Sequence, residues 1–86
     1  MINSLERKNR LYAADLARKY FSGQISMHQF LNNLLDYQND IKIRFLIDKV
    51  EKRPKKGWFF DVSRERNTAY IKEVFIIIED LENSDV

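Results

Sequence analysis

The chain of 86 residues contains no cysteine, which excludes disulfide bonds, thiolate metal sites and a cysteine nucleophile. Its single histidine, His28, cannot form a zinc site without cysteines or a second histidine. No apolar run approaches the ~18 residues of a membrane span, and the N-terminal residues are charged where a signal peptide is apolar. We therefore expect a cytoplasmic protein with no membrane segment, no metal and no cofactor.

Glycine and proline are also scarce, with two and one residues. Hydrophobic residues make up 44% of the chain and aromatic residues 13%, which is typical of an ordered globular domain. The length allows a single small helical domain, 1–86. We expect residues 82–86 to form a frayed acidic tail.

The charges are divided unevenly along the chain. Residues 42–66 carry nine basic and four acidic side chains, whereas residues 67–86 carry one basic and five acidic side chains. Such a division can steer a binding partner, or it can be satisfied within the fold if the acidic end lies beside the basic segment.

A short segment around Gly23 combines the features that end one helix and begin another. Gly23 can adopt the left-handed backbone conformation that terminates a helix. Ser26 can cap the next helix, and Gln29 can complete a reciprocal capping box. Ile25 and Phe30 occupy the two positions that a hydrophobic staple joins. The segment predicts a tight corner between two helices.

The spacing of the apolar residues predicts an all-α fold, a compact bundle of about four helices near 4–21, 26–38, 40–53 and 64–82. In the first helix the expected apolar stripe comprises Leu5, Tyr12, Leu16 and Tyr20, widened by Ala13 and Ala17. In the second helix the expected apolar face comprises Met27, Phe30, Leu31, Leu34 and Leu35.

The segment 41–50 supports two interpretations. Asp40 is a candidate N-cap, and the apolar residues after it recur with helical spacing at Ile43, Leu46, Ile47 and Val50. The first residues of the segment are also β-branched and alternate with period two, which is typical of a strand. The alternative is an α+β fold in which 41–50 and 58–62 pair as a hairpin. We prefer the helix because its polar face is completed by Asp48, Lys49, Glu51 and Lys52.

The last predicted helix is apolar around much of its circumference. Its stripe comprises Ile71, Val74, Phe75, Ile78 and Leu81, extended by Tyr70, Ile76 and Ile77. We expect such a helix to be enclosed, either at the centre of the bundle or in the interface of a homodimer. The exposed side of residues 70–78 is the first candidate contact surface.

No arrangement of residues indicates catalysis. The chain lacks a glycine-rich phosphate loop and a nucleophile elbow, and no base accompanies the hydroxyl groups of residues 63–68. The corner resembles the second half of an EF-hand loop, but the calcium-ligand positions hold Arg18, Tyr20, Ser22 and Gln29. We expect neither an enzyme nor a calcium-binding protein.

The same corner, an aromatic-rich helix followed by Gly23-x-Ile25-Ser26-x-x-x-Phe30, is similar to the first helical hairpin of some small bacterial immunity proteins that neutralise colicin-like toxins. The resemblance implies a helical fold and a protein toxin as the partner. Those proteins usually present acidic surfaces to basic nucleases, whereas the middle of this chain is basic.

The most basic stretch of the chain also contains three consecutive aromatic residues, 58–60. Cations and aromatic rings together can hold phosphates and stack on bases. In a purely structural role the cations keep a loop solvated and the rings attach it to the core. The candidate partner or nucleic-acid contacts are Lys52, Arg53, Lys55, Lys56, Trp58, Phe59, Arg64 and Arg66.

The complete set of helix features, without any catalytic or metal arrangement, favours a small non-catalytic protein-protein interaction module. Its forms include a homodimer, an adaptor, a regulator and an immunity-type inhibitor, each with a protein partner or a second copy. The alternative is a nucleic-acid-binding protein that uses the basic and aromatic segment 52–66.

Overall fold

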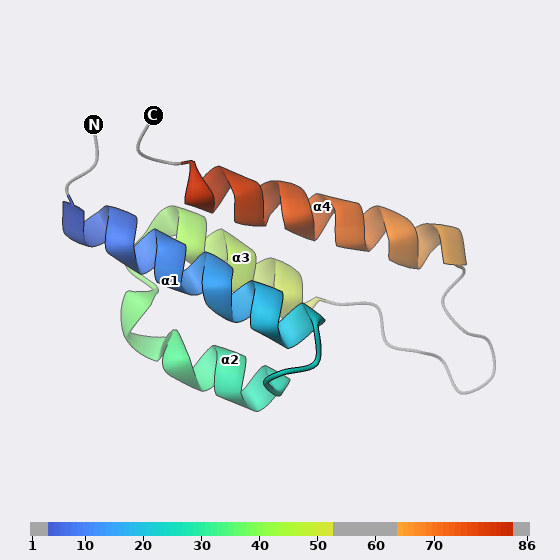
Figure 1. Cartoon of the computed structure of the whole chain (residues 1–86), viewed down its shortest axis with the longest axis horizontal. Helices are drawn as coiled ribbons and strands as arrows, with labels where there is room; N and C mark the ends of the chain where they lie inside the picture. Colours follow the sequence, from blue (N-terminus) through green and yellow to red (C-terminus); the bar gives the residue numbers. More distant parts are fainter. Residues whose placement is uncertain (1–3, 53–63, 84–86) are drawn as a thin grey trace.

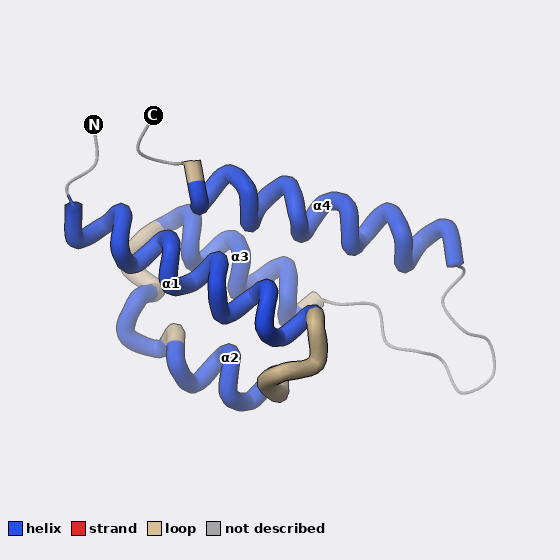
Figure 2. The backbone as a smooth tube through the Cα atoms, viewed as in Figure 1, coloured by secondary structure: helices blue, strands red, loops and turns tan. Residues whose placement is uncertain are grey.

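The computed structural model describes residues 4–52 and 64–83, with the backbone alone for residues 64–67. The described elements are α1 (Ser4–Phe21), α2 (Met27–Asn33), the 3-10 turn η1 (Leu35–Tyr37), α3 (Ile41–Glu51) and α4 (Arg64–Glu82) (Figures 1 and 2). The predicted all-α bundle of about four helices is confirmed. The α+β alternative is wrong because residues 41–50 lie within α3; its second segment, 58–62, lies outside the described residues.

The corner after α1 forms as predicted. Gly23 has a φ of 84°, in the left-handed region that favours glycine. The N–H of Gly23 donates to the carbonyl of Tyr20 at 3.1 Å, and the N–H of Gln24 donates to the carbonyl of Lys19 at 2.8 Å. These two bonds form a Schellman motif, which satisfies carbonyl groups at the end of α1.

The predicted capping box at the start of α2 is also present. The Gln29 N–H donates to Ser26 Oγ at 3.1 Å, and the Ser26 N–H donates to Gln29 Oε1 at 2.8 Å. Phe30 is fully buried, and Ile25 is partly buried against the same core. The cap therefore fixes the direction in which α2 leaves the corner.

The second predicted helix, 26–38, is interrupted. α2 ends at Asn33, and η1 follows with tighter turns. Leu35, which was predicted to lie on the apolar face of this helix, is 58% exposed. The next helix begins as predicted, with the Lys42 N–H donating to the Asp40 carboxylate at 2.9 Å.

The helices are arranged around α1, which packs against each of the other three. α4 lies along α1 and α3 and runs antiparallel to both, whereas α2 lies on the opposite side of α1 (Figure 1). Of the two places expected for the last helix, the centre of the bundle is occupied by α1 instead, and a place in a homodimer interface stays a prediction. α1 takes the central place because Ala13, Ala14 and Ala17 are fully buried and, being small, let neighbouring helices approach closely.

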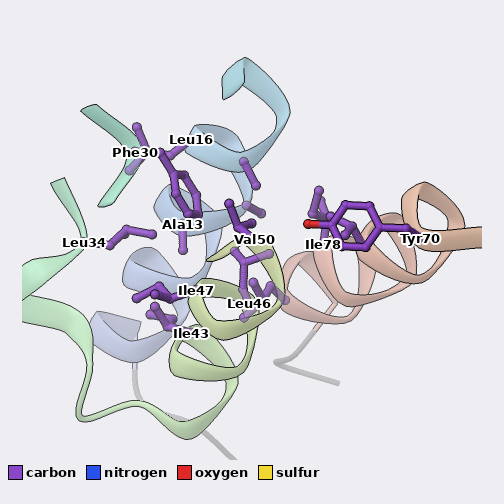
Figure 3. Packing of buried hydrophobic residues seen from close by; sticks show 14 residues of the cluster. Ala13, Leu16, Phe30, Leu34, Ile43, Leu46, Ile47, Val50, Tyr70 and Ile78 are labelled. Atoms are coloured by element: carbon purple, nitrogen blue, oxygen red, sulfur yellow. The ribbon is translucent and has the colours of Figure 1, made fainter. Parts of the chain in front are cut away.

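The core contains side chains from all four helices (Figure 3). Its members are Ala13, Ala14, Leu16, Ala17, Phe30, Leu34, Ile43, Leu46, Ile47, Val50, Tyr70, Val74, Ile78 and Leu81. The predicted stripe of α3 is confirmed in full. In α1 the predicted residues Leu5 and Tyr12 are exposed instead, since the buried face is centred on the alanines. None of the helices in the described ranges has the length and apolar character required to cross a membrane.

Candidate functional site

The structure describes the predicted basic and aromatic contacts only in part. Lys52 directly follows α3 and is exposed. Arg64 and Arg66 belong to the start of α4, where the backbone alone is described. The predicted contacts that lie outside the described residues are Arg53, Lys55, Lys56, Trp58 and Phe59. Nucleic-acid binding by this segment stays a prediction.

A different candidate surface lies on α3 and α4. Ile41 and Phe45, one helical turn apart on α3, are 82% and 58% exposed, and Ile76 on α4 is 66% exposed. The two α3 residues lie on the opposite side of the helix from the buried stripe that includes Leu46 and Val50. α3 therefore carries two apolar surfaces, one directed into the core and one directed outward.

Two ion pairs connect α3 to α4 next to these apolar residues. Lys42 Nζ lies 3.0 Å from Asp80 Oδ2, and Lys49 Nζ pairs with a carboxylate oxygen of Glu73. All cations in these pairs belong to α3 and all anions to α4. Their side chains are partly exposed, so each pair contributes on the order of 0–1 kcal/mol to stability. The acidic last helix does lie beside part of the basic segment.

The ion pairs show the level of α3 relative to α4. The helices are antiparallel (Figure 1), and the two pairs are two turns apart on each helix. By the rise of an α-helix, Phe45 therefore lies level with Ile76 and Ile77. The exposed apolar side chains of both helices therefore lie side by side. We refer to this surface as the α3–α4 face, formed by Ile41, Phe45 and Ile76 with the ion-paired Lys42, Lys49, Glu73 and Asp80.

A cleft of about 430 Å³ opens at the start of α3, beside an ion pair between Arg10 and Asp40. Arg10 Nε donates to Asp40 Oδ2 at 2.7 Å, and its Nη2 donates to Oδ1 at 3.2 Å. Burial by itself raises the pKa of Asp40, but hydrogen bonds from Arg10 and from the Lys42 N–H outweigh it, so the pKa lies below its usual value. This pair holds the start of α3 to α1, which is a structural role.

The described residues offer little for chemistry. Among them no three histidine, cysteine or acidic side chains are placed to share a metal ion. Within the same ranges no polar or charged side chain is buried in the core. His28 is exposed at the second position of α2.

The sequence prediction placed a candidate contact surface on one of the two helices of the α3–α4 face. It selected the exposed side of residues 70–78, where Ile76 is exposed while Tyr70, Val74 and Ile78 are buried in their own subunit. It missed the share of α3. Ile41 and Phe45 could have been found, because they are the apolar residues with i, i+4 spacing that remain once the buried stripe of α3 is assigned.

Comparison of the chain with protein-family models, with curated proteins and with solved structures finds no match in any of the three. The likeness of the corner to immunity proteins rests only on the residues that carry it.

Proposed function

We propose that this protein is a non-catalytic protein-binding module whose contact surface is the α3–α4 face. The observation that supports the proposal is the exposure of Ile41, Phe45 and Ile76, at 58–82%, side by side on two helices that are fixed by ion pairs. At those exposed fractions the three side chains together expose on the order of 400 Å², which is in the range of the largest apolar patch on a typical monomer, a patch that is often functional.

These three exposed side chains take no part in the core of the fold. The core contains fully buried residues from α1 to α4 without them. Covering each large apolar side chain with a partner would contribute about 1.5–3 kcal/mol to binding before the entropic cost of association. Charged residues on both sides of Phe45 provide the polar rim that surrounds the apolar centre of many protein interfaces.

The surface is also formed by two helices that are joined by a hydrogen bond as well as by the ion pairs. α3 is capped by Asp40 at its start, and α4 is attached to it through Lys49, whose backbone carbonyl accepts a hydrogen bond from Tyr70 Oη at 2.8 Å. Preformed helical surfaces lose less entropy on binding than loops do. An adaptor, a regulator and an inhibitor of the immunity type would all use such a surface.

The proposal is tested by photo-crosslinking in the cells that produce the protein. A photoreactive phenylalanine analogue replaces Phe45 in one variant and Leu35 in the control, since both side chains are 58% exposed and Leu35 lies on η1, outside the α3–α4 face. We expect nuclease-resistant adducts to protein from position 45 and none from position 35. Equal labelling from both positions, or adducts that disappear with nuclease, would contradict the proposal.

A further inference from the structure

We infer that the occupant of the α3–α4 face is a second copy of the chain, related by a two-fold axis that runs parallel to the helices. In this arrangement α3 of each copy lies over α4 of the other. The inference rests on the proposed function and deepens it by naming the partner. It follows from the distribution of charge across the face.

The ion-paired residues of α3 and α4, which we call the inner charged rows, can pair with the same rows of a second copy. On α3 the row consists of Lys42 and Lys49, and on α4 it consists of Asp80 and Glu73. A two-fold axis parallel to the helices moves α4 of the second copy over α3 without changing the level of any residue. Lys42 then faces Asp80 of the second copy, and Lys49 faces Glu73 of the second copy.

The other face-to-face arrangement has its axis across the helices and is disfavoured. It places α3 over α3 in reversed direction, so that Lys42 of one copy faces Lys49 of the other. It likewise places Asp80 over Glu73. Like charges opposed in this way weaken an interface, which selects the axis parallel to the helices.

The apolar centre matches under the selected axis. Phe45 lies level with Ile76 in its own subunit, so the axis brings Phe45 of one copy against Ile76 of the other. The contact occurs twice because the interface is symmetric. Ile41, the most exposed of the three, extends the apolar contact toward the end of α4 in the second copy.

The outer charged rows match as well. On the far side of Phe45 from the lysines, α3 exposes Arg44 and Asp48; on the corresponding side of Ile76, α4 exposes Glu79 and Lys72. By the level of the ion pairs, Arg44 faces Glu79 of the second copy within one residue. Asp48 faces Lys72 of the second copy within about half a helical turn. Both outer contacts pair opposite charges.

The area of the face limits the strength of this dimer. α3 spans roughly 16 Å at a rise of about 1.5 Å per residue, and two packed helices present a width of about 20 Å. These dimensions give a footprint of roughly 320 Å² on each copy and about 640 Å² in total. This is below the about 1,200 Å² at which stable specific interfaces begin, so we expect a weak dimer that forms only at high protein concentration.

Sedimentation equilibrium tests the second copy as the partner. Between about 10 µM and 1 mM we expect the apparent mass to rise from 10.4 kDa toward twice that value. The double variant Phe45→Ser/Ile76→Ser should raise the dissociation constant at least about a hundredfold. The matched control is Leu35→Ser/Leu5→Ser, which alters side chains that are 58% and 65% exposed outside the face and should leave the dimer unchanged. Helical circular dichroism of both variants checks that they fold.

Disulfide cross-linking tests the geometry, since the natural chain has no cysteine. Phe45→Cys and Ile76→Cys are prepared as separate proteins, mixed and oxidised. We expect a linked dimer from the mixture and little from either protein alone, because a disulfide requires Cα atoms about 4.4–6.8 Å apart. Linkage of Phe45→Cys to itself, without linkage in the mixture, overturns the parallel axis.

The outcomes separate this inference from the proposed function. A chain that stays monomeric at 1 mM, while position 45 still photo-crosslinks to a different protein, overturns the second copy and leaves the protein-binding face standing. Loss of both the self-association and every position-45 adduct overturns both. A dimer that the Leu35→Ser/Leu5→Ser variant abolishes, and the Phe45→Ser/Ile76→Ser variant does not, overturns the assignment of the face.

Discussion

The two sides of α3 differ in a way that separates folding from binding. The inner side carries Ile43, Leu46, Ile47 and Val50, all of which are buried against the other helices. The outer side carries Ile41 and Phe45, which are mostly exposed. Both sides are apolar, yet only the inner one is used within the subunit. The apolar content of a helix in a small domain can thus exceed what its own core uses, and on α3 this excess is the basis of the proposed contact surface.

The largest expected effect is on the free energy of unfolding, and it should differ sharply between two neighbouring residues of α3. Leu46→Ala should lower the free energy of unfolding by about 2–5 kcal/mol, because it opens a cavity in the core. Phe45→Ala should change it by less than about 0.5 kcal/mol in dilute solution, where the chain is monomeric. Urea denaturation at low protein concentration measures both. Equal losses would erase the distinction between the two sides.

A substitution of Asp40 tests whether its ion pair with Arg10 holds the start of α3 to α1. Asp40→Asn should keep the N-cap but lose the charge-assisted bonds to Arg10, at a cost of about 1–2 kcal/mol near pH 7. Since the pKa of Asp40 is depressed in the folded state, the unfolded chain binds more protons as the pH falls below about 4. Stability supplied by Asp40 is therefore full above that pH and is lost as the pH falls through the folded pKa.

Denaturation of the natural chain and of Asp40→Asn between about pH 2 and pH 7 checks this expectation. The variant should lose less stability on acidification. Its acid dependence should not vanish, because hydrogen bonds from Arg18 also hold the pKa of Glu82 below its usual value. Identical acid profiles for the two proteins would show that the Arg10 pair contributes nothing.

A substitution of Gly23 should lower the stability of the fold at a site far from α3. Gly23→Ala should destabilise the fold by about 1 kcal/mol, because alanine is strained at a φ of 84° although no atom lies within 4 Å of the added Cβ. Thermal unfolding measures this loss. Dimerisation of the folded variant should be unaffected. A weakened dimer would indicate that the corner, and not the outer side of α3, controls association.

Under the protein-binding proposal, charge reversal in the basic segment 52–66 has the smallest expected effect. The rival nucleic-acid hypothesis predicts a large one. If residues 52–66 hold phosphates, affinity for mixed-sequence DNA or RNA should fall steeply with salt and weaken further in Lys55→Glu/Lys56→Glu. The protein-binding proposal expects no binding at low ionic strength and no change in the variant. Fluorescence anisotropy with labelled oligonucleotides distinguishes the two.

Local sequence rules predicted the parts of the fold that depend on neighbouring residues. The Gly23 terminus, the Ser26 capping box and the Asp40 cap are each formed within a few residues, so the sequence specifies them directly. The buried stripe of α3 follows from periodicity alone. The interruption of the second helix at Leu34 was not predicted. It depends on the path by which the chain connects α2 to α3, which local sequence rules do not give.

The packing partners could not be read from periodicity. The alanines of α1 counted only as additions to a stripe of larger residues, whereas their small size is what places α1 at the centre. Describing the α3–α4 face requires the level of α3 relative to α4, which is shown by ion pairs between residues far apart in the sequence. Spacing within one helix cannot supply that level.

The most direct test of the central claim is a dilution series followed by two-dimensional NMR of backbone amides. As the concentration rises from about 20 µM to 1 mM, we expect chemical-shift changes confined to residues 41–49 and 72–80, with residues 13–17 and η1 unchanged. Spectra that do not change, or that change on α1 and α2 and not on the α3–α4 face, would contradict the claim that the outer side of α3 is a surface for a second copy.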